Sequence, residues 1–188
     1  MEPRAAYDRP MTSRLTQPTI RRIRPQDADG WREVRLRALL DAPDAFGSTH
    51  TETVQRPPEA WTTRAARSSE GDRDALFLAD GGPQLVGLVG GYRSSDDDHM
   101  RQLYSMWVAP DFRGTGLAER LVDHVVDWAT TSGASRLDLW VTSTNGQAIR
   151  FYERLSFEAT GRRQQVRPGS DLDELEMTLE LRIPREVN

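Results

Sequence analysis

A run of eight residues between an apolar segment and a long amphipathic segment carries the clearest chemistry in this sequence. It reads Asp-Phe-Arg-Gly-Thr-Gly-Leu-Ala over residues 111–118. Glycine at a turn between a strand and a helix lets the backbone approach a ligand closely, because no Cβ stands in the way. The first turn of a helix has free N–H groups and the positive end of the helix dipole, which together favour an anion. The run therefore predicts a cradle for pyrophosphate, or else a tight loop whose glycines serve only the backbone.

Two predicted elements position this cradle. Residues 100–108 have the apolar content of a strand, and Pro110 follows their end. From about residue 116 the pattern is helical, because four large apolar residues recur at spacings of four, four and three and form one buried stripe. These are Leu117, Leu121, Val125 and Trp128. Gly133 is expected to end the helix.

The remaining pattern alternates between short strands and helices. We expect helices at about 27–41, 60–68 and 145–155, and strands at 19–24, 75–79, 84–92, 136–141, 157–163 and 172–181. Asp27 is a plausible N-cap for the first helix, and residues 43–56 are predicted to be a loop. The order β-α-α-β-β-β-α-β-α-β-β predicts an α+β domain, in which helices cover a mixed sheet. We expect a disordered leader at 1–18 and a single domain at 19–183.

The composition restricts the class of protein. The chain has 188 residues, no cysteine and no lysine, so it has no thiolate, no Schiff-base lysine and no P-loop lysine. No apolar run approaches the ~18 residues of a membrane span, and the N-terminus lacks a signal-peptide core. The net charge of −4 gives no electrostatic reason to bind nucleic acid. Three histidines, far apart in sequence, do not suggest a metal site. We expect a cytoplasmic protein that binds no metal, no membrane and no nucleic acid.

Three motifs, in this order, resemble the GNAT acyltransferase superfamily. Arg113-x-x-Gly116-x-Ala118 fits the family's Arg/Gln-x-x-Gly-x-Gly/Ala motif and follows a strand that ends in Met-Trp-Val. Asn145 and the triplet Phe-Tyr-Glu at 151–153 come after the next strand. The resemblance covers residues 19–181. It implies a three-layer α/β/α fold with a mixed, mostly antiparallel sheet of about six to seven strands and helices on both faces. It also implies acetyl-CoA as co-substrate.

The resemblance implies roles for particular residues. The pyrophosphate of acetyl-CoA would sit on the amides of 113–118, and the pantetheine arm would lie between the strands that end at Val108 and Val141. The Arg113 side chain would fix the turn or pair with phosphate, and an N–H of 106–108 would polarise the thioester. Asn145 would bind the arm or merely cap its helix. The implied cofactor-binding set is Met106, Trp107, Val108, Arg113, Gly114, Thr115, Gly116, Leu117, Ala118, Asn145 and Tyr152.

Tyr152 is the predicted catalytic residue. In many family members a tyrosine at this place protonates the departing thiolate of CoA. A phenol of pKa ~10 is reasonably matched to an alkyl thiol of pKa ~8.5 for such a transfer. The alternative is an aromatic residue that only packs beside Phe151.

The general base is where the sequence departs from the family. Several relatives carry a glutamate at the position of Gln102, and an amide cannot accept a proton at neutral pH. A water chain, another residue or an acceptor amine that arrives neutral would have to replace it. His50, Glu52 and Tyr104 are candidates by analogy, although each also has an ordinary role in a loop or on a sheet. We expect Phe46, Glu52 and Tyr104 to contact the acceptor. Ser156 also departs from the family, which usually has glycine in that turn.

Three functions can be considered for these motifs, and two of them remain. The first is an N-acetyltransferase that moves the acetyl group directly to a primary amine of a small molecule or protein, in a ternary complex. The second is a non-catalytic acyl-CoA-binding or sensor domain. A dinucleotide-binding domain is disfavoured, because the full three-glycine spacing is missing. The acceptor is not readable from segments 46–56 and 166–173, and a monomer and a homodimer remain open.

Overall fold

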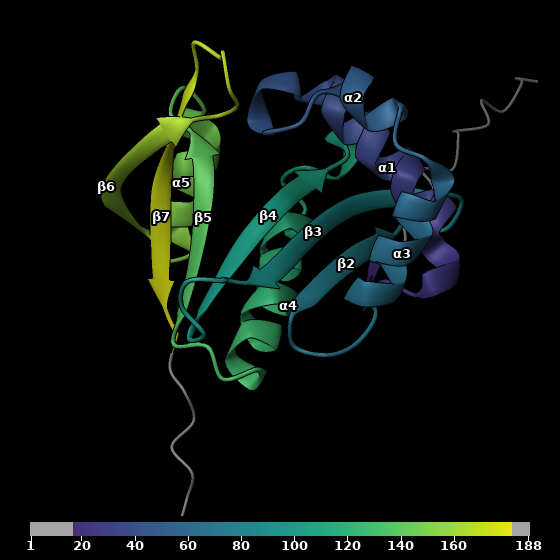
Figure 1. Ribbon diagram of the computed structural model, residues 1–188, viewed down its shortest axis with the longest axis horizontal. Coiled ribbons are helices and arrows are strands. Elements are labelled where there is room, and N and C mark those ends of the chain that lie inside the picture. Colours follow the sequence, from purple (N-terminus) through teal and green to yellow (C-terminus); the bar gives the residue numbers. More distant parts are fainter. Residues whose placement is uncertain (1–16, 182–188) are drawn as a thin grey trace, which may run out of the picture.

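A seven-stranded sheet in the order β1-β2-β3-β4-β5-β7-β6 is the frame of the fold (Figure 1). The computed structural model of the protein describes residues 17–181. The strands are β1 Thr19–Arg22, β2 Asp74–Asp80, β3 Leu85–Arg93, β4 Met100–Val108, β5 Arg136–Thr142, β6 Glu158–Gln165 and β7 Asp173–Glu180. Only β4 and β5 pair in parallel, and the other neighbours are antiparallel. The predicted mixed, mostly antiparallel sheet is confirmed.

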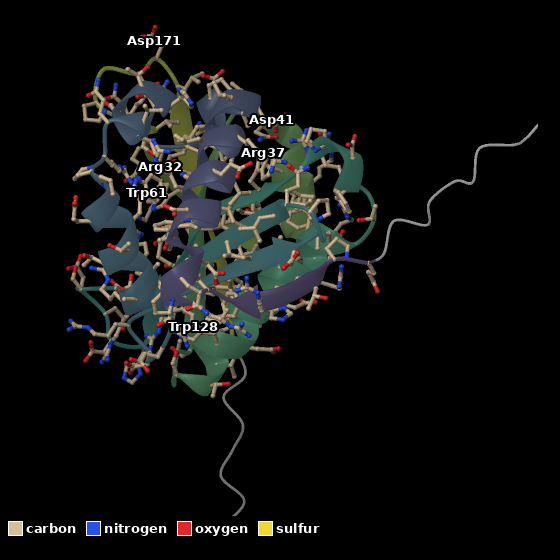
Figure 2. The ribbon with its side chains drawn as sticks, turned by 90° about the vertical axis from the view of Figure 1, so that its right-hand side faces the viewer. Arg32, Arg37, Asp41, Trp61, Trp128 and Asp171 are labelled. Atoms are coloured by element: carbon tan, nitrogen blue, oxygen red, sulfur yellow. The ribbon has the colours of Figure 1, made fainter. Side chains whose placement is uncertain are left out.

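Helices cover both faces of the sheet, as predicted. They are α1 Ala28–Asp41, α2 His50–Val54, α3 Pro58–Ser68, α4 Leu117–Thr131 and α5 Gly146–Arg154. Figures 1 and 2 show α1 and α3 on one side of strands β2 to β4 and α4 on the other. The predicted stripe of α4 is buried, with Leu117, Leu121 and Val125 fully inaccessible. Burial of this stripe removes apolar surface from water and fixes the direction of the helix that starts at the cradle.

The structure corrects several local predictions. Residues 43–56 are not a continuous loop, because α2 forms within them. Thr49 and Glu52 cap this helix reciprocally, with the Thr49 hydroxyl 3.2 Å from the Glu52 N–H and the Glu52 carboxylate 2.9 Å from the Thr49 N–H. Asp27 precedes α1 but does not cap it, because its carboxylate pairs with Arg21 and accepts from the Arg24 N–H.

Other predicted boundaries move by one to two residues. β1 ends at Arg22 rather than residue 24, and α3 begins at Pro58, since proline is tolerated in a first helical turn. The leader expected at 1–18 lies almost entirely outside the described residues, as does the end of the domain expected at 183. Among residues 17–181, no helix combines the length and the apolar character needed to cross a membrane.

The centre of the sheet opens because β4 carries a bulge. Leu88 pairs with Trp107 but Gly90 pairs with Tyr104, so β4 has one residue more than β3 between these pairs. Ser105 in this interval has a left-handed φ of 57°. β4 and β5 pair only from Met100 to Leu103 and then diverge, although both strands continue. A bulge bends its strand and ends regular pairing, so it explains the gap beside the end of β4.

Candidate functional site

Two cavities meet where β4 and β5 diverge. The first, the cradle cavity, has a volume of about 380 Å³ and is bordered by the ends of α1 and β4, the start of α4, and α5. The second, the arginine cavity, has a volume of about 410 Å³ and is lined by Arg35, Arg56 and Arg64 together with residues of β3 to β7. Ala45 and Phe46 line both cavities. The short segment before α2 therefore separates them.

The cradle forms where the predicted turn meets α4. Gly114 and Gly116 have φ values of 73° and 80°, which an L-residue with a Cβ rarely adopts. The first bond inside α4 runs from the Arg120 N–H to the Gly116 carbonyl at 3.2 Å, so the N–H groups of 117–119 have no acceptor within the helix. The Thr115 hydroxyl closes the turn by donating to the Phe112 carbonyl at 2.7 Å. This turn has the free amides and the helix dipole that an anion needs.

Arg113 holds the turn to the rest of the fold. Its Nε donates to the Val108 carbonyl at 3.1 Å, and its guanidinium pairs with the carboxylate of Asp41. The same carboxylate accepts from the Trp107 indole at 2.8 Å. Asp41 is the last residue of α1 (Figure 2). Sequence reasoning missed it, because no local pattern connects a helix end with a turn 72 residues later. Of the two roles expected for Arg113, the structure has it fixing the turn.

The end of β4 offers backbone groups to the cradle cavity. Met106, Trp107 and Val108 line the cavity. On one side Trp107 and Val108 pair with β3, but on the other side β5 pairs only as far as Leu103. Backbone groups that face the gap are therefore available to an extended ligand, which can add to the sheet as a strand would.

Asn145 and Tyr152 complete this cavity from α5. The Asn145 side-chain oxygen accepts from the Ala148 N–H at 3.0 Å, so the capping role is real and the amide nitrogen keeps its donors. Tyr152 packs between Phe151 and Phe157, with ring centroids 5.1 and 5.6 Å away. Burial raises the pKa of its phenol above the ordinary value, so the hydroxyl stays protonated at neutral pH.

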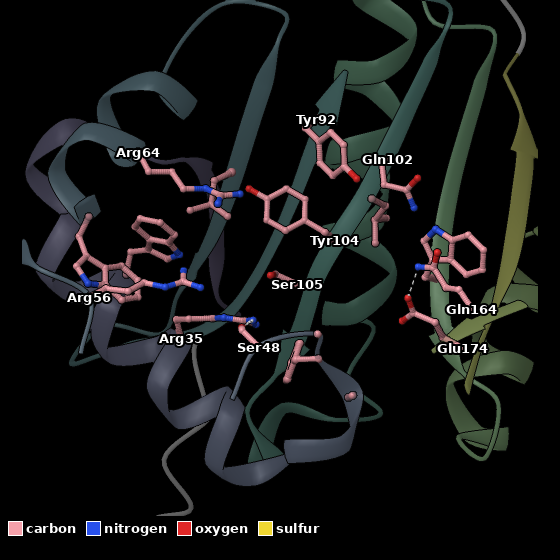
Figure 3. A pocket seen from close by; sticks show the side chains of 18 residues that line it. Arg35, Ser48, Arg56, Arg64, Tyr92, Gln102, Tyr104, Ser105, Gln164 and Glu174 are labelled. Atoms are coloured by element: carbon pink, nitrogen blue, oxygen red, sulfur yellow. Dashed lines mark hydrogen bonds between the residues drawn. The ribbon is translucent and has the colours of Figure 1, made fainter. Parts of the chain in front are cut away.

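The arginine cavity has walls of opposite character (Figure 3). Arg35 of α1, Arg64 of α3 and Arg56, which precedes α3, lie on one side, and Gln164 and Glu174 lie on the other. The Glu174 carboxylate accepts from the Gln164 amide at 2.6 Å. Burial raises its pKa, and the bond from Gln164 lowers it by less. Sequence reasoning missed Glu174, since β7 has several acidic residues and the pattern does not distinguish this one.

The residues predicted to contact an acceptor, and those that bear on the identity of the base, divide into two groups. Phe46 borders both cavities, and Tyr104 and Gln102 line the arginine cavity. The Tyr104 ring lies over β3, where glycine is required: a Cβ at Gly90 would be 2.3 Å from the ring. Glu52 and His50 line neither cavity. The Glu52 carboxylate caps α2 at the surface, and its bonds from Thr49 lower its pKa.

Arg35 is the other residue that sequence reasoning missed, although a signal was present. It follows Trp31 by four residues and precedes Ala38 and Leu39 by three and four, so it falls on the core-facing stripe of α1. Trp31 in turn meets Trp61 of α3 edge to face, with centroids 4.7 Å apart. A charged residue inside an apolar stripe is rarely buried without a purpose or a partner.

Comparisons with known proteins agree with this geometry. A sequence model described as the acetyltransferase (GNAT) family matches residues 38–157. A mycothiol acetyltransferase from Brachybacterium faecium is 28% identical over 144 residues, which cover 76% of this chain and 41% of the relative. The chain spans about half the length of the curated relatives that it matches.

Solved structures have the same fold. An acetyltransferase of the GNAT family from Streptococcus pneumoniae superposes with a TM-score of 0.76 at 21% identity, over 88% of this chain and all (100%) of that one. A protein from Salmonella typhimurium, solved with its cofactor acetyl-CoA, superposes with a TM-score of 0.71 at 20% identity, over 89% of this chain and 95% of that one. These likenesses confirm the predicted fold.

Proposed function

The chain belongs to the acetyltransferase (GNAT) family, and from this premise we propose that it transfers the acetyl group of acetyl-CoA to a primary amine. The observation that carries the proposal is the cradle cavity. It brings free helix amides, an unpaired strand edge and the hydroxyl-bearing side chain of Tyr152 onto one surface. Each of these groups corresponds to a different part of an acyl-CoA.

The residues present fit acetyl-CoA. The N–H groups at the start of α4 would hold the pyrophosphate, and the glycine backbone leaves room for it. Backbone groups at the end of β4 would pair with the amides of the pantetheine arm. When bound, acetyl-CoA supplies an activated acetyl group on a thiol that leaves readily.

The chain's own groups can support direct transfer. The amine nitrogen attacks the thioester carbonyl carbon, a C–N bond forms, and the C–S bond breaks with its electron pair going to sulfur. An N–H within 106–108 would stabilise the negative charge that develops on the carbonyl oxygen. The Tyr152 phenol would donate its proton to the sulfur and recover one from solvent. The burial that raises the pKa of Tyr152 also raises the proton affinity of a thiolate beside it.

Glu174 is our candidate for the group that accepts the proton lost by the amine. Gln102 cannot take it, and Glu52 caps α2 away from both cavities. Glu174 pairs with Thr142 in the β5–β7 register, and Thr142 is three residues before Asn145. It therefore lies at the same end of the diverging strands as the cradle cavity. A carboxylate whose pKa is raised by burial is a better base than an exposed one.

Thiol release tests the proposal directly. The chain has no cysteine, so a thiol reagent reports only the CoA released from acetyl-CoA. We expect release to depend on an added amine, and the product to gain the mass of one acetyl group. The alternative, a non-catalytic acyl-CoA sensor, is favoured only by Gln102. It predicts CoA binding with no release from any amine, and a Tyr152→Phe variant that is indistinguishable from wild type.

A further inference from the structure

Arg35 is a buried cation without a carboxylate. Only 8% of the residue is exposed. Its Nη2 donates to the Ser48 hydroxyl at 3.0 Å and its guanidinium stacks on Phe46, with Cζ 4.3 Å from the ring centroid. Its Nη1 is buried and has no acceptor among the described residues. Burying a guanidinium without an opposite charge is costly, so the fold retains an unfavourable group at this position.

Two further arginines add to the same positive charge. Arg56 and Arg64 also line the cavity, and within residues 17–181 none of the three forms an ion pair with a carboxylate. Burial, and then the charge of Arg56, lowers the pKa of Arg35 to about 10. The cavity is therefore electropositive although the whole chain has a net charge of −4.

Several residues that line the cavity also carry a buried donor without a partner in residues 17–181. Besides Arg35, five of its lining residues have a buried N–H or O–H group with no partner in the described part of the chain. They are Trp31, Trp61, Arg64, Gln102 and Tyr104. Buried polar groups are normally satisfied. All of these groups can donate, so the cavity favours a ligand that accepts hydrogen bonds, such as an anion with several oxygens.

The opposite wall has the complementary charge. Among residues 17–181, Glu174 is the only carboxylate that lines the cavity. It lies across from the arginines, with Tyr92 and Tyr104 between the two walls (Figure 3). A molecule that carries an anion at one end and an ammonium at the other would match both walls.

We propose that the arginine cavity binds an anionic group of the acetyl acceptor, a carboxylate or a phosphate, through Arg35, Arg64 and Arg56. The guanidinium fork presents parallel N–H donors that suit both anions. With the anion on this wall, the amine of the acceptor points toward Glu174 and the boundary at Phe46. That the ligand is an acetyl acceptor rests on the proposed function, but binding of an anion at this site can be tested without turnover.

The first experiment uses matched acceptors. Thiol release from acetyl-CoA is measured with a set of L-amino acids against the same amino-acid amides, and with phosphoethanolamine against ethanolamine. We expect at least one anionic acceptor to exceed its neutral partner by about tenfold or more in kcat/KM, since charge-assisted bonds to a buried group are lost in the neutral partner. The two series distinguish a carboxylate from a phosphate.

The variants give the control. In Arg35→Met the preference for the anionic acceptor should collapse toward the neutral rate. Arg32→Met is the matched control, because Arg32 lies one turn earlier on α1 and does not line the cavity (Figure 2). It should keep the preference. An anionic preference that survives Arg35→Met, or neutral acceptors that react as fast as anionic ones, overturns the proposal and leaves the acetyltransferase function standing.

A second experiment needs no catalysis. With CoA at saturation to occupy the cradle, inorganic phosphate or glutarate is added, and the melting temperature of wild type is compared with that of Arg35→Met. We expect at least one of these anions to stabilise wild type and Arg32→Met but not Arg35→Met. Equal shifts in wild type and Arg35→Met, or no shift in either, contradict the anion site. If these anions stabilise wild type and Arg32→Met but not Arg35→Met, and no amine releases thiol, the site stands and the proposed function fails.

Discussion

The two cavities that meet at Phe46 are built in different ways. The cradle cavity relies on backbone groups and on side chains that already have partners, such as Arg113 with Asp41 and Asn145 with the Ala148 N–H. The arginine cavity relies on side chains from α1, α3 and strands β3 to β7, and many of its donors have no partner among the described residues. A cavity whose side chains already have hydrogen-bond partners suits a ligand that is bound through backbone amides, whichever acceptor that ligand reacts with. Unsatisfied groups favour one particular ligand over others.

The difference has a consequence for mutants. Changes in the cradle cavity should affect every acceptor alike, because they act on the shared acetyl donor. Changes in the arginine cavity should alter the choice between acceptors. Substitutions in each cavity test this division.

Tyr152→Phe should have the largest effect. We expect kcat to fall by about 10²-fold, as for the loss of a general acid, with the same factor for anionic and neutral acceptors. CoA affinity, measured by calorimetry, should be almost unchanged, because the ring still packs between Phe151 and Phe157. A loss confined to one class of acceptor would place Tyr152 in acceptor recognition and break the division.

Arg35→Met should separate stability from selectivity. The anionic preference should fall by about tenfold or more. The free energy of unfolding without ligand should change by less than about 1 kcal/mol or should rise, because an apolar side chain of similar length replaces an uncompensated charge. Chemical denaturation measures this. A loss of several kcal/mol in Arg35→Met, with Arg32→Met unaffected, would make Arg35 a packing residue instead.

Glu174→Gln should lower kcat/KM by about tenfold at neutral pH. The deficit should shrink as the pH approaches the pKa of the acceptor amine, since a neutral amine needs no base. Glu180→Gln, an exposed position on the same strand, is the control. A deficit that is constant with pH would exclude a proton-accepting role.

The same residue links stability to pH. Burial raises the folded pKa of Glu174 above the ~4.3 of an unfolded glutamate. The folded state then holds more protons than the unfolded state between these two values, so this group's stabilising contribution is lost as pH rises through that window. Glu174→Gln should remove that loss, which denaturation at several pH values can measure.

The cradle could be predicted from sequence because its information is local. The glycines, the strand before them and the helix after them are adjacent in the chain, and the apolar stripe of α4 fixes its direction. Even α2 had a local signal, since Thr49-x-x-Glu52 is a capping box. Residues 43–56 were predicted to be a loop because the short helix lacks an apolar stripe.

The arginine cavity could not be predicted, because its parts meet only in three dimensions. Arg35 and Arg64 come together through the contact of Trp31 with Trp61, and Glu174 lines the same cavity from β7, beyond the gap in the sheet. That gap depends on the bulge at Ser105, where no glycine or proline marks the sequence. The Arg113–Asp41 pair was missed for the same reason: it joins two elements by a contact that neither sequence pattern contains.

Ser105 should show the smallest effect, and it tests the feature that both cavities share. Its left-handed backbone disfavours a side chain, and a β-branched one most. We expect Ser105→Val to lower the free energy of unfolding by about 1 kcal/mol, and Ser105→Gly to change it by less than about 0.5 kcal/mol, because relief of strain offsets the added freedom of the unfolded chain. If Ser105→Val is as stable as wild type, the bulge is not strained, and the gap between β4 and β5 must be held open by the cavity walls themselves.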